Sequence, residues 1–256
     1  MMVFHSDLDN TMIYSYKHDI GNEKRCVEIY QGREISYVTD RTHELLRQVQ
    51  DRVLFVPTTT RTTEQYRRID LGIGPIRYAL TCNGGELLVD GQEDETWYQE
   101  SLVQIRESRD ELARAEKLLE EDLRRSLEVR NIRGLFLFTK SEQPMESVAI
   151  LRQGLNTGLV DVFSNGTKVY VVPVRLNKGT AVRRFRKKIA ADGVIAAGDS
   201  EFDLPMLAQA DIGFAPEGLR GRCTPGETVL YMGRDRIFSE SILEYIRCWG
   251  QKHLTP

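Results

Sequence analysis

Short apolar runs that end in small or polar residues recur along the chain and predict buried strands. Val3-Phe4 leads into His5-Ser6-Asp7, residues 53–56 end at Pro57-Thr58, residues 77–80 end near Asn83-Gly84-Gly85, and residues 194–197 end at Gly198-Asp199. Helical patterns at residues 42–50 and 62–70 lie between these runs, and a Thr62-x-x-Gln65 capping box opens the second. Strands that alternate with helices predict βαβ units and an α/β fold with a mostly parallel sheet.

The pattern of apolar and polar residues changes in the middle of the chain. Residues 101–130 place leucines at near-helical spacing among many charged residues, which predicts one long amphipathic helix opened by the capping pair Ser101 and Gln104. A strand at 135–138, a short helix near 145–154 and a hairpin of 159–163 and 168–174 turning at Asn165-Gly166 follow. We therefore predict a Rossmann-like core of residues 1–95 and 175–256, with a small α+β domain of residues 96–174 inserted into it.

A second hairpin is predicted near the N-terminus. Residues 26–38 alternate around Gln31-Gly32, which is typical of a β-hairpin. It follows the carboxyl end of the first strand, the edge at which open α/β sheets bind ligands.

Composition and charge narrow the class of protein. No apolar run in the 256 residues approaches the roughly 20 needed to span a bilayer, and the N-terminus becomes polar too soon for a secretory signal. Cys26, Cys82, Cys223 and Cys248 form no CxxC pair, which favours free thiols in the cytoplasm. A net charge of −3 argues against a nucleic-acid partner. We expect a cytoplasmic enzyme with neither a membrane nor a nucleic acid as its partner.

Two carboxylates follow the first predicted strand, in Asp7-Leu8-Asp9-Asn10-Thr11. At a strand end one can attack a substrate, while the other protonates the leaving group and later activates water. Asp-Asn-Thr is also ordinary turn chemistry, so this segment alone leaves both interpretations open.

A second acidic segment, Gly198-Asp199-Ser200-Glu201-Phe202-Asp203, follows the strand at 194–197. Acidic side chains at a strand end can hold Mg²⁺, which prefers hard oxygen ligands. Ser200 and Asp203 also have the spacing of a helix cap, and the two interpretations are compatible.

Two further segments have features suited to phosphate. Lys178 opens a predicted helix, where a cation opposes the helix dipole and is slightly unfavourable as a purely structural choice. Thr58-Thr59-Thr60-Arg61 follows the second strand, and hydroxyls with backbone amides there suit a phosphate oxygen or form an ordinary helix cap.

Four segments, taken in order, resemble the four motifs of the haloacid dehalogenase superfamily. They are Asp7-x-Asp9-x-Thr11, a strand-end threonine, the helix-opening Lys178 and Gly198-Asp199-x-x-x-Asp203. The inserted block is similar to the cap of subfamily IIB, found in Cof-type sugar phosphatases and sucrose-phosphate phosphatases. Asn83-Gly84-Gly85 resembles the Asn-Gly-Ala turn that follows their third core strand. The resemblance spans nearly the whole chain.

The resemblance implies a Mg²⁺-dependent phosphatase that acts on a small phosphate ester, with a sugar phosphate favoured by analogy. Asp7 corresponds to the nucleophile that forms an aspartyl-phosphate, and Asp9 to the general acid/base. Thr59 corresponds to the hydroxyl that binds the phosphoryl group, and Lys178 to the cation that neutralises Asp7 and the phosphate. A carboxylate at Asp9 is typical of the phosphatases rather than of the family members that cleave carbon–halogen bonds.

The same resemblance implies a metal site and contacts to the substrate. Asp199, supported by Asp203, corresponds to the residue that holds Mg²⁺ together with Asp7 and the backbone carbonyl of Asp9. Thr58, Arg61 and Asn83 are candidates for substrate binding, with a brace for its loop as the alternative role of Arg61. Lys168 and Tyr170 of the cap hairpin are further candidates, and surface strand positions explain them equally well.

The sequence departs from the family pattern at two positions. Asn10 replaces the commoner glycine, a change that turn geometry accepts. Thr60 stands where glycine precedes Arg61, so Thr58 and Thr59 both remain candidates for the functional hydroxyl. A phosphomutase or phosphotransferase and a non-catalytic binding protein of the same fold are the alternative functions.

Overall fold

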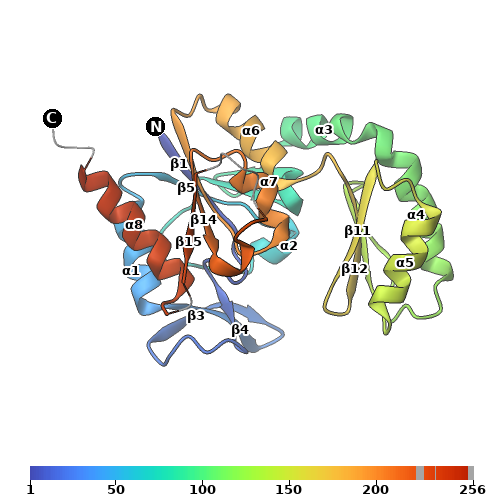
Figure 1. The fold of residues 1–256 in the computed structure, drawn as a ribbon, viewed down its shortest axis with the longest axis horizontal. Helices are drawn as coiled ribbons and strands as arrows, with labels where there is room; N and C mark the ends of the chain where they lie inside the picture. The colour runs from blue at the N-terminus through green and yellow to red at the C-terminus, as the bar shows by residue number, and fades with distance from the viewer. Residues whose placement is uncertain (223–227, 234, 253–256) are drawn as a thin grey trace. The chain divides into compact units, whose positions relative to one another are not determined.

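A computed structural model describes residues 1–222, 228–233 and 235–252, and the chain forms two compact units (Figure 1). Unit 1 comprises Met1–Glu93 and the chain from Lys178 onwards, and unit 2 comprises Asp94–Asn177. Each unit is described by itself below.

The centre of unit 1 is a parallel sheet of strands buried on both faces. Its order is β15 (Val229–Met232), β14 (Ile212–Pro216), β13 (Gly193–Ala197), β1 (Met2–Ser6) and β5 (Leu54–Pro57). All four pairings between neighbours are parallel. The predicted α/β class with a mostly parallel sheet is confirmed.

Helices cover both faces of this sheet. On one face α1 (Asp40–Val49) and α8 (Phe238–Lys252) lie side by side (Figure 1) and share a core with Phe4, Phe55 and Ile195. On the other face α6 (Lys178–Lys188) and α7 (Leu204–Leu207) enclose Val194 and Ala196. Side chains along β1 therefore alternate between two cores.

The helix predicted at 62–70 is much shorter than expected. The predicted capping box of Thr62 and Gln65 is present, but α2 spans only Thr63–Tyr66. The chain beyond it joins another element, because Ile69 forms a β-bridge with Glu28 and the Asp70 amide donates to the Val27 carbonyl at 2.9 Å. A tertiary pairing therefore overrides the helical pattern after Tyr66.

The hairpin predicted at 26–38 is confirmed. Strands β3 (Lys24–Tyr30) and β4 (Arg33–Thr39) pair antiparallel, and β2 (Tyr14–Ser15) extends the sheet. Gln31 and Gly32 both have positive φ, of 50° and 73°, the geometry of a two-residue turn that matches strand twist. We call β3 and β4 the inserted hairpin.

A small antiparallel sheet follows β5 in unit 1. It consists of β6 (Tyr78–Thr81), β7 (Glu86–Val89) and β8 (Gln92–Glu93), with the turn η1 (Cys82–Gly84) between the first two. The sequence predicts β6 but not β7 and β8. A parallel bridge between Thr58 and Leu80 places β6 beside the end of β5. Two short helical turns, η3 (Glu201–Asp203) and η4 (Glu217–Leu219), complete the unit.

Unit 2 is a four-stranded antiparallel sheet with helices packed on one face. The strand order is β11 (Val160–Asn165), β12 (Lys168–Pro173), β10 (Phe136–Lys140) and β9 (Arg130–Ile132). Helices α4 (Arg109–Glu121) and α5 (Pro144–Gly154) bury Leu137, Val169 and Val171. The predicted hairpin is confirmed, but its two-residue turn is Gly166-Thr167 rather than Asn165-Gly166, because Asn165 still pairs with Lys168. Strand β9 was not predicted.

The single long helix predicted over 101–130 is wrong. Helix α3 (Glu95–Gln104) is capped by Asp94, and the turn η2 (Arg106–Ser108) separates it from α4. Ser101 lies inside α3, where its hydroxyl donates to the Trp97 carbonyl at 2.9 Å. No glycine or proline marks the break, but the Ser108 hydroxyl donates to the Leu159 carbonyl, which ties the break to the sheet of the unit. Leu123 is fully exposed and belongs to no helix.

Candidate active site

Asp7 begins the loop that follows β1 and is fixed at the carboxyl edge of the sheet. Its backbone amide donates to the Ala197 carbonyl at the end of β13, at 2.9 Å. The loop closes on itself, because the amides of Met12 and Ile13 both donate to the Leu8 carbonyl at 2.9 Å. Asn10 adopts a left-handed conformation with φ of 59°, the turn geometry expected where asparagine replaces glycine.

Lys178 joins two carboxylates in the interior of unit 1. Its Nζ donates to Asp7 Oδ1 at 2.5 Å and to Asp203 Oδ1 at 2.6 Å, and the residue is 1% exposed. Glycine at 179 permits this approach, since a Cβ there would lie 2.0 Å from the backbone oxygen of Pro205. Position 179 therefore has no room for a side chain beside Pro205.

Three carboxylates meet at this point. Oxygens of Asp7, Asp199 and Asp203 lie within 4.8 Å of one another. The Thr11 hydroxyl donates to Asp199 Oδ1 at 3.2 Å, which links the first motif to the last. A Cβ at Gly198 would come within 2.2 Å of the Asp203 Cβ, so the glycine before Asp199 gives Asp203 its room. We call Asp7, Asp199, Asp203 and Lys178 the acidic cluster.

Asp203 has a second set of contacts. Its Oδ2 accepts hydrogen bonds from the Ser200 amide at 3.1 Å and the Ser200 hydroxyl at 2.9 Å, so the predicted cap is present. Both carboxylate oxygens of Asp203 thus have partners within the protein. Asp199, in contrast, is partly exposed and accepts from Thr11 on one oxygen.

Burial shapes the protonation of this cluster. Burial raises the pKa of Asp7 well above its usual value, Lys178 opposes the rise, and Asp203 and Asp199 add to it. The pKa of Asp199 is raised to about 6, first by burial and then by Asp203. Burial alone lowers the pKa of Lys178, but Asp203 and Asp7 outweigh it and the pKa lies above its usual value.

The donor set fits a divalent cation. Three carboxylates and one ammonium group leave two negative charges uncompensated when all are ionised. Hard carboxylate oxygens are the ligands that Mg²⁺ prefers. The residues of the acidic cluster therefore match the charge and the ligand type of Mg²⁺.

Asp9 lies outside this group of three carboxylates and pairs with arginine instead. Arg61 Nε donates to Asp9 Oδ2 and Arg61 Nη2 to Asp9 Oδ1, both at 2.7 Å. The third nitrogen, Nη1, lies 2.9 Å from Glu28 Oε2 on the inserted hairpin. Sequence reasoning missed Glu28, which sits in an ordinary alternating strand and carries no motif.

The two candidate threonines differ in their partners, although both are buried. The Thr58 hydroxyl lies 2.9 Å from His5 Nδ1 and donates to the Val56 carbonyl. Burial lowers the pKa of His5 to about 3, so this imidazole is neutral at physiological pH. The Thr59 hydroxyl oxygen accepts from the Arg61 amide at 3.1 Å, and among the described residues no acceptor takes its hydrogen.

Asn83 braces the loop that contains these threonines. Its backbone has a φ of 58°, and its amide donates to the Thr59 carbonyl at 3.0 Å. The Cys82 amide donates to the Arg61 carbonyl at 2.7 Å. The turn η1 therefore holds residues 59–61 through backbone hydrogen bonds.

In unit 2 the sheet face opposite the helices carries aromatic side chains. Tyr170 stacks on Phe163 with ring centroids 5.2 Å apart and lies 5.8 Å from Phe138. The Lys168 ammonium lies 5.9 Å from the centre of the Phe138 ring. Lys168 and Tyr170, the two cap residues proposed from the sequence, thus belong to one aromatic and cationic surface.

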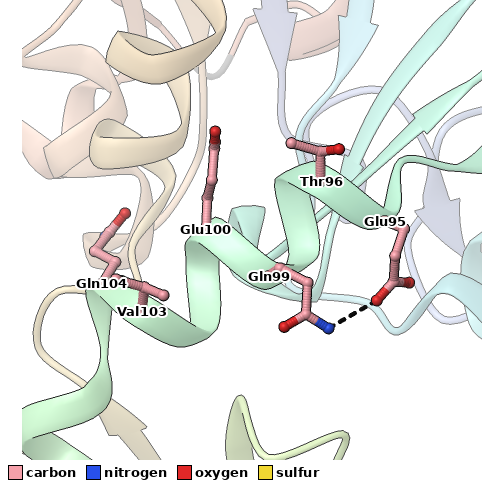
Figure 2. A pocket seen from close by; sticks show the side chains of 6 residues that line it. All are labelled: Glu95, Thr96, Gln99, Glu100, Val103 and Gln104. Atoms are coloured by element: carbon pink, nitrogen blue, oxygen red, sulfur yellow. Dashed lines mark hydrogen bonds between the residues drawn. The ribbon is translucent and has the colours of Figure 1, made fainter.

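Figure 2 shows an open hollow along α3 in the same unit. A single helix supplies its whole lining, in which the Gln99 amide donates to Glu95 at 2.8 Å. The lining residues are Glu95, Thr96, Gln99, Glu100, Val103 and Gln104. None of them is a predicted site residue.

Two general properties complete the description. Cys26, Cys82 and Cys248 form no disulfide, and Cys223 lies outside the described residues. Within the described residues, no helix combines the length and apolar character needed to cross a membrane.

Comparisons with known proteins agree with this architecture. Residues 91–217 match the family described as haloacid dehalogenase-like hydrolase. A phosphoglycolate phosphatase from Methanopyrus kandleri is 30% identical over 178 residues, which cover 67% of this chain and 73% of that protein. The sucrose-phosphatase from Synechocystis sp. PCC6803, solved with sucrose and phosphate, superposes with a TM-score of 0.65 at 20% identity and 97% coverage of both chains. Protein 0175 from Thermoplasma acidophilum gives a TM-score of 0.60 at 14% identity, with 96% of this chain and 98% of that one covered. The chain belongs to the haloacid dehalogenase-like hydrolases, as a phosphatase of their Cof-type subfamily IIB.

Proposed function

We propose that the protein hydrolyses a small phosphomonoester in a Mg²⁺-dependent reaction in which Asp7 is the nucleophile. The acidic cluster supports this proposal most directly, because Lys178 holds Asp7 at the sheet edge among carboxylates with two uncompensated negative charges. Phosphoryl transfer requires a positioned nucleophile and positive charge around the equatorial oxygens. The cluster provides the nucleophile, one cation and ligands for a second.

The reaction proceeds in two transfers. In the first, an Asp7 oxygen bonds to phosphorus as the ester P–O bond breaks, and the leaving oxygen takes a proton from Asp9. In the second, water gives a proton to Asp9 and attacks the aspartyl-phosphate, the P–O bond to Asp7 breaks, and inorganic phosphate leaves. Both carboxyl groups return to their initial states.

The remaining residues hold the reactants. Lys178 neutralises Asp7 and a phosphoryl oxygen, and Thr59 donates its free hydroxyl hydrogen to another. Asp7, Asp199 and the backbone carbonyl of Asp9 would hold Mg²⁺, while Asp203 fixes Lys178. Bound there, Mg²⁺ cancels negative charge on the carboxylates and on the phosphate.

We further propose a sugar phosphate as the substrate class and unit 2 as the domain that selects it. The stacked faces of Phe163 and Tyr170 suit a sugar ring, and the adjacent Lys168 suits its hydroxyls or an anionic group. The Synechocystis structure contains sucrose and phosphate, whereas the archaeal relative is named for phosphoglycolate. The free thiols suit the cytoplasm as the location.

Hydrolysis of p-nitrophenyl phosphate by the metal-stripped protein, with and without added Mg²⁺, tests the proposed chemistry. Asp7→Asn should lower kcat at least about 10³-fold, because removal of a catalytic nucleophile has costs of this order or larger. Asp51→Asn, an equal change at an exposed site, should leave kcat unchanged. Circular dichroism checks that both variants fold. Turnover by the folded Asp7→Asn variant at the normal rate would show that Asp7 is not the nucleophile.

A screen of phosphorylated metabolites tests the substrate class and the alternative reaction. Sugar monophosphates should release inorganic phosphate faster than phosphoglycolate does. An isomerised sugar phosphate without free phosphate would identify a mutase and contradict hydrolysis. Absence of both products from every ester, with Mg²⁺ present, would indicate a binding protein.

A further inference from the structure

Glu28 is a fully buried carboxylate directly beside the exposed tip of the inserted hairpin, residues 29–34. Its side chain has 0% exposure, and an ionised carboxylate in such a place requires strong partners. It has three: Arg61 Nη1 at 2.9 Å, Arg68 Nε at 3.1 Å and the Ser36 hydroxyl at 2.7 Å. Two of these partners come from the segment that follows β5.

The local backbone directs Glu28 toward that segment. The pairing of β3 with β4 shifts register on both sides of Glu28, which is the signature of a β-bulge. Bulges interrupt strand pairing and re-aim a side chain. The backbone bridge from Glu28 to Ile69, with the bond from the Asp70 amide to Val27, fixes the hairpin against residues 61–70.

Arg61 connects Glu28 to the site. Its guanidinium forms a two-bond pair with the Asp9 carboxylate through Nε and Nη2, and it reaches Glu28 through Nη1. The Asp9 side chain is 48% exposed, so without this pair its carboxylate has room to rotate. The guanidinium group is planar, and its nitrogens bond both carboxylates at once. Because Glu28 fixes one side of the group, the group in turn fixes the position of the Asp9 carboxylate.

We propose that Glu28 is a positioning residue for Asp9 that acts through Arg61, and that the inserted hairpin thereby takes part in the hydrolysis. This inference rests on the proposed function, in which Asp9 protonates the leaving oxygen. Glu28 touches neither the substrate nor the reacting atoms. It determines where the Asp9 carboxylate stands when the ester bond breaks.

The dependence of the rate on the leaving group distinguishes this role from a purely structural one. An alkoxide leaving group requires a proton from Asp9, whereas p-nitrophenolate is stable enough to leave without one. A displaced Asp9 therefore slows the first transfer, which kcat/KM reports, far more for an alkyl phosphate than for an aryl phosphate. General loss of folded protein lowers both rates by the same factor.

The test compares glycerol 2-phosphate with p-nitrophenyl phosphate in the full-length Glu28→Gln variant. We expect kcat/KM, which reports the first transfer alone, to fall about ten-fold for the alkyl ester and to change less than about two-fold for the aryl ester. Glu34→Gln on the same hairpin removes an equal charge from an exposed site and should change neither rate. Equal losses for the two esters in Glu28→Gln would overturn the inference.

A second comparison shows whether the effect passes through Arg61. In an Arg61→Gln background the further change Glu28→Gln should have no additional effect on the ratio of the two rates. If Glu28→Gln does not fold, Ser36→Ala removes one of the hydrogen bonds to Glu28 and should lower the same ratio less. An unchanged ratio in folded Ser36→Ala would also count against the inference.

The proposed function and this inference fail in different ways. Wild-type rates that persist in Asp7→Asn would refute the nucleophile and with it the basis of the inference. An inactive Asp7→Asn variant, together with a leaving-group ratio that Glu28→Gln does not alter, would refute only the role of Glu28.

Discussion

The acidic cluster and a second cluster of buried or half-buried charged side chains in unit 1 differ in their net charge. The acidic cluster joins three carboxylates to one lysine. The second cluster, which we call the arginine cluster, joins Asp9 and Glu28 to Arg61 and Arg68, so its charges cancel. Buried charge is costly unless it is compensated. An added cation or bound protons can therefore balance the first cluster, whereas the charges of the second already balance.

The clusters also differ in the elements that build them. The acidic cluster lies at the ends of β1 and β13 and at the start of α6, all fixed by the central sheet. The arginine cluster depends on the inserted hairpin and on the loop after β5. We infer that changes in the first remove the chemistry itself, whereas changes in the second alter its efficiency.

The largest expected effect comes from Lys178→Met, which removes the cation of the acidic cluster. Asp7 and Asp203 then lose their shared partner inside the protein. Breaking a buried ion pair in this way costs about 3–5 kcal/mol of stability. Turnover should fall at least about 10³-fold, since Asp7, the proposed nucleophile, also loses its orientation. Urea unfolding and phosphate release measure the two effects.

Lys187→Met is the matched control for this change, because Lys187 is exposed on the same helix. It should alter stability by less than about 0.5 kcal/mol and leave turnover unchanged. Wild-type stability in Lys178→Met would mean that the ammonium does not balance Asp7 and Asp203.

Asp199→Asn should act mainly on the metal. The change removes one of the charges that favour a divalent ion, and we expect the Mg²⁺ concentration for half-maximal activity to rise about 100-fold. The shift in Tm that Mg²⁺ produces should shrink in parallel, which reports binding without relying on activity. Glu201→Gln, an exposed neighbour in the same loop, is the control. An unaltered response to Mg²⁺ in Asp199→Asn would place the ion elsewhere.

Arg61→Lys should have a smaller effect and a different signature. Lysine keeps the charge but cannot form the two-bond pair with Asp9 while also reaching Glu28. We expect kcat for an alkyl ester to fall about ten-fold while the Mg²⁺ requirement stays the same. Arg67→Lys, at a half-exposed site nearby, should match the wild type. A raised Mg²⁺ requirement in Arg61→Lys would show that the two clusters are not separate.

The sequence predicts the acidic cluster better than the arginine cluster for a physical reason. Asp7, Lys178 and Asp199 each stand at the end or start of a regular element, so the parallel sheet alone brings them to one edge. Glu28 reaches Arg61 through a β-bulge and a backbone bridge to Ile69, which no spacing in the chain encodes. Long-range pairings of this kind become visible only in the folded protein.

The errors in the predicted helices have the same origin. Leu123 shares the period of Leu112 and Leu119, but it is exposed, and α4 ends at Glu121. The break between α3 and α4 and the early end of α2 are both set by contacts with distant segments. Periodicity located the helical regions correctly, while tertiary contacts decided where each helix ends.

The smallest expected effect is a dependence of stability on pH that Mg²⁺ reverses. The pKa of Asp199 is raised to about 6 by burial and by Asp203, whereas an unfolded aspartate has a pKa of about 3.9. Between these values the folded protein binds more protons than the unfolded chain, so without metal this group stabilises the protein as pH falls from 7 to 5. Its contribution is lost as pH rises through about 6.

Bound Mg²⁺ competes with that proton and should change the sign of the trend. In EDTA, Tm of the wild type relative to Asp199→Asn should rise by a few degrees from pH 7 to pH 5. The increase in Tm produced by Mg²⁺ should be largest at pH 7 and decline below about pH 6, where protonation of Asp199 removes a ligand. The arginine cluster needs no cation, so Glu28→Gln should leave this Mg²⁺ response unaltered. If Mg²⁺ raises Tm equally at pH 5 and pH 7, the ion does not bind to Asp199, and the contrast between the two clusters no longer stands.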